Sequence, residues 1–84
     1  MIPVLLIDDD SRLFELLGSY LGGNEVALSH AADGTKGLQM LDAGAFDAVL
    51  LDVMMPGMNG LEVCKRIRAK GNTPVIMLTA KGDE

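Results

Sequence analysis

The sequence contains few aromatic residues, few basic residues and a single cysteine. Its 84 residues include no tryptophan and only 4% aromatic residues, so a hydrophobic core has to be built from aliphatic side chains and the six methionines. The one cysteine, Cys64, excludes an internal disulfide and a cysteine-rich zinc site, and it favours a reducing compartment. Seven basic residues against twelve acidic ones give a net charge of −5, which argues against direct nucleic-acid binding by this segment.

Long hydrophobic runs are also absent. The apolar run at residues 1–7 lacks a basic leader and stops at Asp8. A membrane span needs about 20 apolar residues, and the core of a secretory signal is longer than this run and ends in small residues. The sequence therefore predicts a cytoplasmic chain with no membrane partner. A content of 49% hydrophobic residues nevertheless excludes intrinsic disorder, and the length allows one small domain at most.

Short aliphatic runs alternate with segments of helical periodicity along the whole chain. The runs predict four strands, at residues 4–7, 25–31, 46–51 and 73–78. Three helices are expected between them, the last one with Asn59 as its N-cap. Strands that are apolar on both faces are typical of parallel sheets with helices on both sides. The predicted fold class is therefore α/β, with a doubly wound parallel sheet in a single unit at residues 1–84.

The same pattern predicts which individual side chains face the core, cap a helix or lie on the surface. In the third predicted helix, Leu61, Cys64 and Ile67 are expected to face the core. Asp10 or Ser11 is expected to cap the first helix. His30, the only histidine, ends the second predicted strand, and we expect it on the surface, away from the first and third strands.

Acidic residues follow the first and third predicted strands. Asp8, Asp9 and Asp10 come after the first strand, Asp52 after the third, and Thr79 ends the fourth. In open parallel sheets the binding site lies beyond the carboxyl ends of the strands. Four carboxylates converging there would repel one another without a cation, and all-oxygen ligands favour Mg²⁺, with Mn²⁺ as a substitute. The sequence therefore predicts a magnesium site at this edge.

Five short motifs occur in order along the chain: Leu5-Leu6-Ile7-Asp8-Asp9-Asp10, Ala32-Asp33-Gly34, Asp47-Ala48-Val49-Leu50-Leu51-Asp52, Met55-Pro56-Gly57-Met58-Asn59-Gly60 and Pro74-Val75-Ile76-Met77-Leu78-Thr79-Ala80. With these motifs, essentially the whole chain resembles the receiver domain of two-component response regulators. Residues 8–10 and 53–56 are similar to regulators that carry a winged-helix DNA-binding domain. The resemblance implies a flavodoxin-like sheet of strand order 2-1-3-4, a partial receiver that lacks the last strand and two helices of the family.

The resemblance implies a phosphoacceptor signalling module and not an enzyme, with no chemistry beyond its own phosphorylation and dephosphorylation. Asp52 would accept a phosphoryl group from a sensor histidine kinase in a Mg²⁺-dependent reaction. Asp8, Asp9, Asp52 and the backbone carbonyl of Met54 would bind the metal. Thr79 would contact the phosphoryl group and act as a switch.

The carboxyl end of the chain departs from the family pattern. A receiver supplies a phosphate-binding lysine after its fifth strand, and Lys81 does not match that position. Loss of one fixed donor of this kind costs roughly 2.7–4 kcal/mol of transition-state stabilisation, so phosphorylation is expected to be impaired. Residues 75–78 would form an exposed apolar edge, which predicts self-association through this strand or the adjoining sheet face.

Two alternative functions are compatible with parts of the pattern. One is a receiver fragment that is not phosphorylated and acts only by dimerising or by competing for a kinase. The other is a phosphatase of the haloacid dehalogenase type, which also places a nucleophilic aspartate at the end of a parallel strand. That family requires a second aspartate two residues after the nucleophile, where this chain has Met54.

Overall fold

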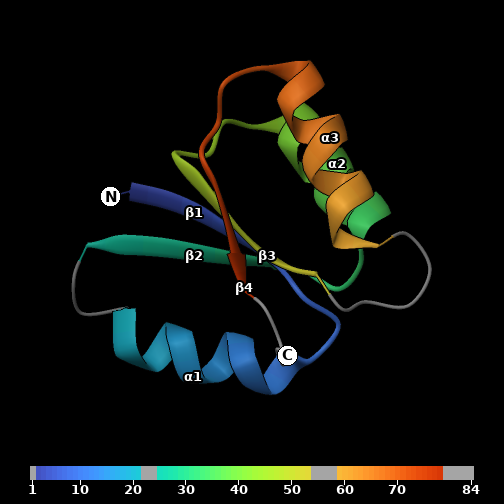
Figure 1. Cartoon of the computed structure of the whole chain (residues 1–84). Coiled ribbons are helices and arrows are strands. Elements are labelled where there is room, and N and C mark those ends of the chain that lie inside the picture. The colour runs from blue at the N-terminus through green and yellow to red at the C-terminus, as the bar shows by residue number, and fades with distance from the viewer. Residues whose placement is uncertain (1, 22–24, 54–58, 79–84) are drawn as a thin grey trace.

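The computed structural model describes residues 2–21, 25–53 and 59–78 (Figure 1). Strands and helices alternate along these residues in the order β1 (Ile2–Ile7), α1 (Ser11–Leu21), β2 (Val26–Ala31), α2 (Gly34–Ala43), β3 (Ala48–Asp52), α3 (Gly60–Lys70) and β4 (Val75–Leu78). The predicted alternation is confirmed. The third and fourth strands each begin two residues later than expected. The first strand begins at Ile2, two residues earlier than expected.

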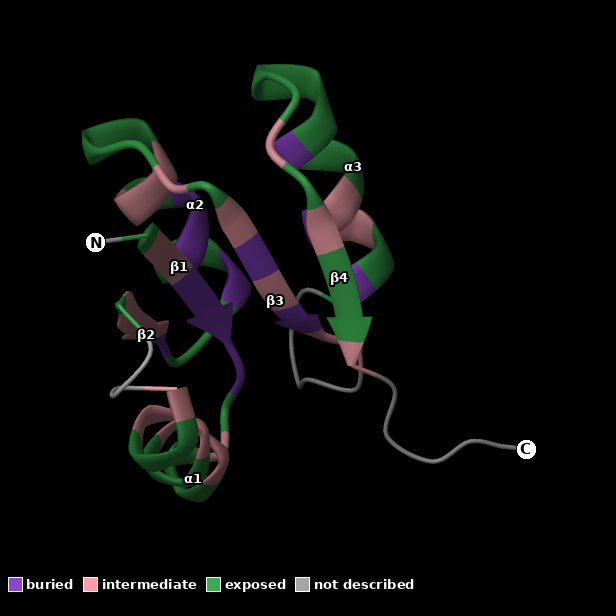
Figure 2. Ribbon diagram, turned by 90° about the vertical axis from the view of Figure 1, so that its left-hand side faces the viewer, coloured by how far each residue is buried: buried purple, intermediate pink, exposed green. Residues whose placement is uncertain are grey.

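The four strands form one parallel sheet in the order β2-β1-β3-β4, which confirms the expected strand order. α2 contacts β1 and β2, and α3 contacts β3, so these two helices cover one face (Figures 1 and 2). α1 lies on the other face against β2. Within the described ranges, no helix has both the length and the apolar character that crossing a bilayer requires.

The core lies between the central strands and the pair α2 and α3. Leu5 and Ile7 of β1 alternate with Leu6, and Val49 and Leu51 alternate in the same way on β3. All five side chains are fully buried. Because side chains alternate between the two faces of a strand, Leu6 lies on the α1 face while the others join the cluster under α2 and α3.

The prediction for the buried face of α3 is partly wrong. Val63 and Ile67 are buried, whereas Leu61 is 59% exposed and Cys64 is half-buried. A buried helical stripe advances by alternating steps of three and four residues. The expected set of Leu61, Cys64 and Ile67 advances by three residues each time, so it starts off the buried stripe at Leu61 and reaches it at Ile67, while Cys64 packs against the edge of the core. Asn59 caps this helix as predicted, since its side chain accepts a hydrogen bond from the Glu62 N–H.

Candidate functional site

The carboxyl ends of β1 and β3 meet at one edge of the sheet. Ile7, the last residue of β1, pairs with Leu51 in a parallel register. Asp8 follows Ile7 directly, and Asp52 is the last residue of β3. Two neighbouring parallel strands thus deliver their aspartates to the same place, which is the edge at which the sequence predicts a site.

Three of the four candidate carboxylates gather at this edge. Carboxylate oxygens of Asp8, Asp9 and Asp52 all lie within 4.8 Å of one another. The three side chains differ in exposure: Asp8 is 3% exposed, Asp52 is half-buried and Asp9 is exposed. The cluster therefore has a buried base and a side that is open to solvent, as a ligand arriving from solution requires.

Asp8 makes three hydrogen bonds, through its N–H, its carbonyl and one carboxylate oxygen. Its N–H donates to the carbonyl of Ala31 at 3.0 Å, which extends the pairing of β1 with β2. Its carboxylate Oδ1 accepts from the N–H of Asp10 at 2.8 Å. Its own carbonyl accepts from Nε2 of His30 at 2.8 Å. These three hydrogen bonds hold Asp8 at the base of the cluster.

The electrostatics of the cluster favour a cation. Burial is the main cause that raises the pKa of Asp8, and the charges of Asp52, Asp9 and Asp10 raise it further. The hydrogen bond from the Asp10 N–H acts in the opposite direction. A positive ion would remove the repulsion that these carboxylates exert on one another. Among the described residues, the cluster offers three carboxylates as ligands. Oxygen ligands of this kind suit Mg²⁺ or Mn²⁺.

Asp10 does not join the cluster. Its Oδ1 accepts from the Arg12 N–H at 2.9 Å, which is the helix-capping interaction expected from the sequence. The Arg12 side chain also contacts it, with Nε at 3.1 Å and a second nitrogen at 3.1 Å. This contact with Arg12 lowers the pKa of Asp10. The convergence of four carboxylates is therefore reduced to three, because the fourth is held by an arginine two residues along the chain.

Two of the predicted site residues, Met54 and Thr79, lie outside the described residues, as does Lys81. The positions of the Met54 carbonyl and the Thr79 hydroxyl accordingly stay predictions.

The contact of His30 with Asp8 was not predicted from the sequence. His30 is half-buried and not a surface residue away from β1, because β2 lies directly beside β1 and His30 pairs with Leu6. From there its ring reaches the Asp8 carbonyl and stacks on Phe14 of α1, with ring centroids 5.0 Å apart and an angle of 13° between the rings. The expected strand order, with strand 2 next to strand 1, contained the signal that could have revealed this contact.

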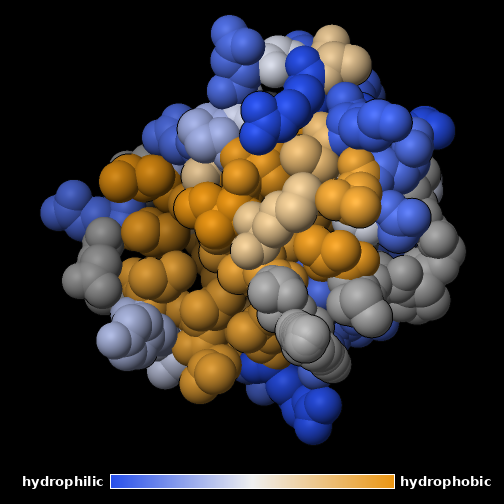
Figure 3. Space-filling view, in the orientation of Figure 1, coloured by the Kyte–Doolittle hydropathy of each residue, from blue (hydrophilic) through white to orange (hydrophobic). Residues whose placement is uncertain are grey.

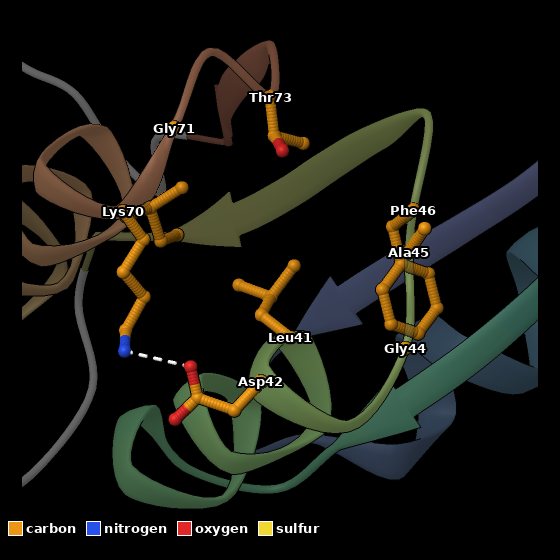
Figure 4. Close-up of a pocket in the computed structure, with 9 residues that line it drawn as sticks. Leu41, Asp42, Gly44, Ala45, Phe46, Lys70, Gly71 and Thr73 are labelled. Atoms are coloured by element: carbon orange, nitrogen blue, oxygen red, sulfur yellow. Dashed lines mark hydrogen bonds and ion pairs between the residues drawn. The ribbon is translucent and has the colours of Figure 1, made fainter.

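A cavity of about 340 Å³ lies at the opposite edge of the sheet (Figure 4). It is bounded by the ends of α2 and α3 and by residues 44–46 and 73, ahead of β3 and β4. Its two charged lining residues, Asp42 and Lys70, pair with each other at 2.7 Å. Both side chains are well exposed, and surface ion pairs of this kind contribute little to the stability of the fold. The cavity thus offers no convergent set of reactive groups, and the acidic cluster is the better candidate.

Comparison with known proteins places this geometry in a family. The family model for the response regulator receiver domain matches residues 4–84. The chain is 44% identical over 81 residues to the transcriptional regulatory protein ResD of Bacillus subtilis, covering 96% of this chain and 34% of that protein. It is also 44% identical over 80 residues to the DNA-binding response regulator MtrA of Mycobacterium tuberculosis, covering 95% and 35%. The chain therefore spans about a third of the length of these relatives.

Solved structures show the same arrangement. The response regulator TrrA of Thermotoga maritima, solved in complex with Mg²⁺ and BeF, is 36% identical with a TM-score of 0.90, covering 98% of this chain and 72% of that one. TrrA in its complex with the histidine kinase ThkA gives a TM-score of 0.89, with coverage of 99% and 72%. The family match, the identity to response regulators and the shared fold show that this chain belongs to the response regulator receiver domain family.

Proposed function

We propose that this chain is a phosphoacceptor module of a two-component phosphorelay, in which Asp52 receives a phosphoryl group from the phosphohistidine of a sensor histidine kinase. The observation that carries the proposal is the gathering of the Asp8, Asp9 and Asp52 carboxylates within 4.8 Å at the carboxyl edge of the sheet. The complex of the relative TrrA with the histidine kinase ThkA supports the choice of partner.

The proposed reaction is a transfer between two nucleophiles. A carboxylate oxygen of Asp52 attacks the phosphorus, and the new O–P bond forms as the P–N bond of the phosphohistidine breaks. The electron pair of the broken bond goes to the imidazole nitrogen. Asp52 suits this role because β3 holds its backbone while its half-buried side chain stays accessible. Hydrolysis of the resulting aspartyl phosphate is the only other chemistry that we propose, so the module is regulatory and not an enzyme.

The metal site of the proposal consists of Asp8, Asp9, Asp52 and the Met54 carbonyl, with Mg²⁺ as the ion and Mn²⁺ as a substitute. When bound, the cation supplies neutralisation of the negative charge on the phosphoryl oxygens. The all-oxygen donor set and the raised pKa of Asp8 support this assignment. The relative TrrA has been solved with Mg²⁺ and BeF. We further propose that the Thr79 hydroxyl donates a hydrogen bond to a phosphoryl oxygen and acts as the switch.

The names of two relatives suggest the process that this receiver controls. ResD and MtrA are named as a transcriptional regulatory protein and a DNA-binding response regulator, and the chain matches about a third of each. We propose that this receiver controls transcription in the cytoplasm through a separate output domain. With a net charge of −5, the receiver segment itself is not proposed to bind DNA.

Phosphorylation by a small donor tests the proposed function. We expect the chain to gain one phosphoryl group from acetyl phosphate in the presence of Mg²⁺, as measured by intact mass, because the Asp52 carboxylate is the proposed phosphoacceptor. The Asp52→Asn variant is expected to gain none, since an amide oxygen is a poor nucleophile. Asp47→Asn is the matched control, because Asp47 is an exposed carboxylate just ahead of β3, at the other end of that strand.

The control variant is expected to react like the wild type. Equal labelling of the wild type and Asp52→Asn would contradict the assignment of Asp52. Absence of labelling in all three proteins, with Mg²⁺ present, would favour a receiver that acts only by dimerisation or competition.

We also propose that a second copy of this chain binds at the exposed edge of the sheet. Among the described strands, β4 pairs only with β3, and Ile76 and Met77 of β4 are 54% and 38% exposed. β4 is the strand nearest the viewer in Figure 1, and Figure 3 shows apolar side chains gathered on this side of the molecule. An apolar strand with an unpaired edge is a template for pairing with another strand.

Light scattering on a size-exclusion column tests this self-association. We expect a mass above the 8.9 kDa of one chain, and a shift toward the monomer in Ile76→Lys, because a charge on an edge strand opposes pairing. Leu61→Lys is the matched control, because Leu61 is similarly exposed, at 59%, but lies on α3. A monomeric wild type, or an equal effect of the two variants, would contradict the proposed interface.

A further inference from the structure

The carbonyl of Asp8 lies just beyond the paired part of β1. The last residue pair between β1 and β2 is Ile7 with Ala31, and the Asp8 N–H still bonds to the Ala31 carbonyl. β2 ends at Ala31, so no further strand residue faces the Asp8 carbonyl. His30 supplies the missing donor through its side chain, with Nε2 at 2.8 Å from the carbonyl oxygen.

The position of His30 in the sheet explains this reach. His30 pairs with Leu6, and paired residues of neighbouring strands point to the same face. Ile7 joins the core under α2 and α3, so Leu6 and His30 lie on the opposite face, where α1 contacts β2. There the imidazole stacks on Phe14. Because a carbonyl oxygen only accepts hydrogen bonds, Nε2 carries the proton.

These contacts act on the peptide group that joins two members of the acidic cluster. The carbonyl that accepts from His30 belongs to the peptide between Asp8 and Asp9. A peptide group is planar, so fixing its carbonyl also fixes the direction in which the chain leaves toward Asp9. The Asp9 side chain is exposed, and the orientation of this peptide is therefore the main constraint that the described contacts place on it.

We propose that His30, held in place by its stack on Phe14, is a positioning residue that sets the divalent cation affinity of the acidic cluster. The inference rests on the proposed metal-dependent function and deepens it. Groups that orient a metal ligand without touching the metal typically contribute about 10–100-fold to metal affinity. We expect an effect at the lower end of this range, because His30 acts through the backbone and not through a ligand atom.

Direct measurement of Mn²⁺ binding tests the proposal. The free ion is followed by electron paramagnetic resonance at one fixed neutral pH, with Mn²⁺ as the only added metal. In His30→Leu we expect the dissociation constant to rise about tenfold, since leucine fills similar space without a donor. In His30→Gln the side-chain N–H can reach the same carbonyl, and we expect most of the affinity to return. Phe14→Leu keeps His30 but removes the ring that stacks on it. We expect its dissociation constant for Mn²⁺ to lie between those of the wild type and His30→Leu.

Tyr20→Leu is the matched control, because Tyr20 is an aromatic residue further along the same helix and is 79% exposed. It is expected to bind Mn²⁺ like the wild type. Urea unfolding of each variant separates a loss of stability from a loss of affinity. If His30→Leu does not fold, the proposal is tested by comparing the Mn²⁺ dissociation constants of Phe14→Leu and Tyr20→Leu.

The outcomes distinguish this inference from the proposed function. A wild type that does not bind Mn²⁺ would overturn both. A wild type that binds, together with a His30→Leu variant of equal affinity, would overturn only the positioning role. Equal weakening in His30→Leu and His30→Gln would overturn it as well, because only one of the two removes the donor.

Discussion

Gly60→Ala is expected to destabilise the chain by about 3 kcal/mol, the upper part of the range for overpacking a buried position. Gly60 is the buried first residue of α3, and its N–H donates to the Val53 carbonyl at 3.2 Å. A Cβ at this position would lie 2.5 Å from the Val53 Cα and 2.9 Å from the Asp52 carbonyl oxygen. Both are backbone atoms, which cannot rotate away, so α3 or the end of β3 has to shift.

Urea unfolding followed by far-UV circular dichroism measures this effect. Small domains are stable by about 5–15 kcal/mol, so a loss of this size is a large fraction of the total. Gly18→Ala is the control, because Gly18 lies inside α1 and an added Cβ would meet nothing within 4 Å. There alanine is expected to stabilise the chain by about 0.5–1 kcal/mol through its higher helix propensity. Similar unfolding midpoints for Gly60→Ala and the wild type would contradict the close approach.

Asp8→Asn is expected to stabilise the chain in the absence of divalent cations and to abolish its stabilisation by Mg²⁺. Asp8 is 3% exposed, and its carboxylate lies within 4.8 Å of those of Asp9 and Asp52. At that separation, two unit charges repel by about 1 kcal/mol in water and about 3 kcal/mol at an effective dielectric constant of about 20. The asparagine removes this repulsion, while its side-chain oxygen can still accept from the Asp10 N–H, as Oδ1 of Asp8 does.

The effect of Asp8→Asn depends on pH in a defined direction. Burial raises the pKa of Asp8 above its ordinary value of 3.8, so the folded chain holds this proton more tightly than the unfolded chain. The resulting stabilisation is complete below the unfolded-state pKa and is lost as the pH rises through the folded-state pKa. In EDTA, the advantage of the variant should therefore grow from acidic to neutral pH.

Thermal and urea unfolding with EDTA or Mg²⁺ measure both parts of this prediction. At a Mg²⁺ concentration ten times the dissociation constant, the wild type should gain about 1.4 kcal/mol and the variant none. Asp47→Asn is the control, because it removes an exposed carboxylate at the other end of β3 and leaves the N-caps of α2 and α3 intact. A variant less stable than the wild type in EDTA, or one that still responds to Mg²⁺, would contradict the assignment of Asp8 to the metal site.

Several features of this protein could be predicted from local sequence patterns. The aliphatic runs form β1 and β3, which supply five fully buried side chains, and Asp8 and Asp52 lie at their carboxyl ends. These predictions succeed because strands in the centre of a covered sheet require apolar residues along most of their length. The change to aspartate therefore marks where the strand leaves the core. The cap of α3 by Asn59 is equally local, since donor and acceptor lie three residues apart.

Other features were decided only by the tertiary structure. The buried stripe of α3 runs through Val63 and not Leu61, because the rotation of a helix about its axis depends on the sheet beneath it.

The contact of His30 with Asp8 shows the physical reason most directly. The two residues are 22 positions apart, and the hydrogen bond exists because β2 pairs with β1 in a register that sets His30 opposite Leu6. A shift of one residue would turn the imidazole to the other face of the sheet, away from Phe14. The sequence by itself determined which residues end the strands and carry the acidic groups. The strand register, which arises from packing across the whole sheet, decided which side chains hold those groups in place.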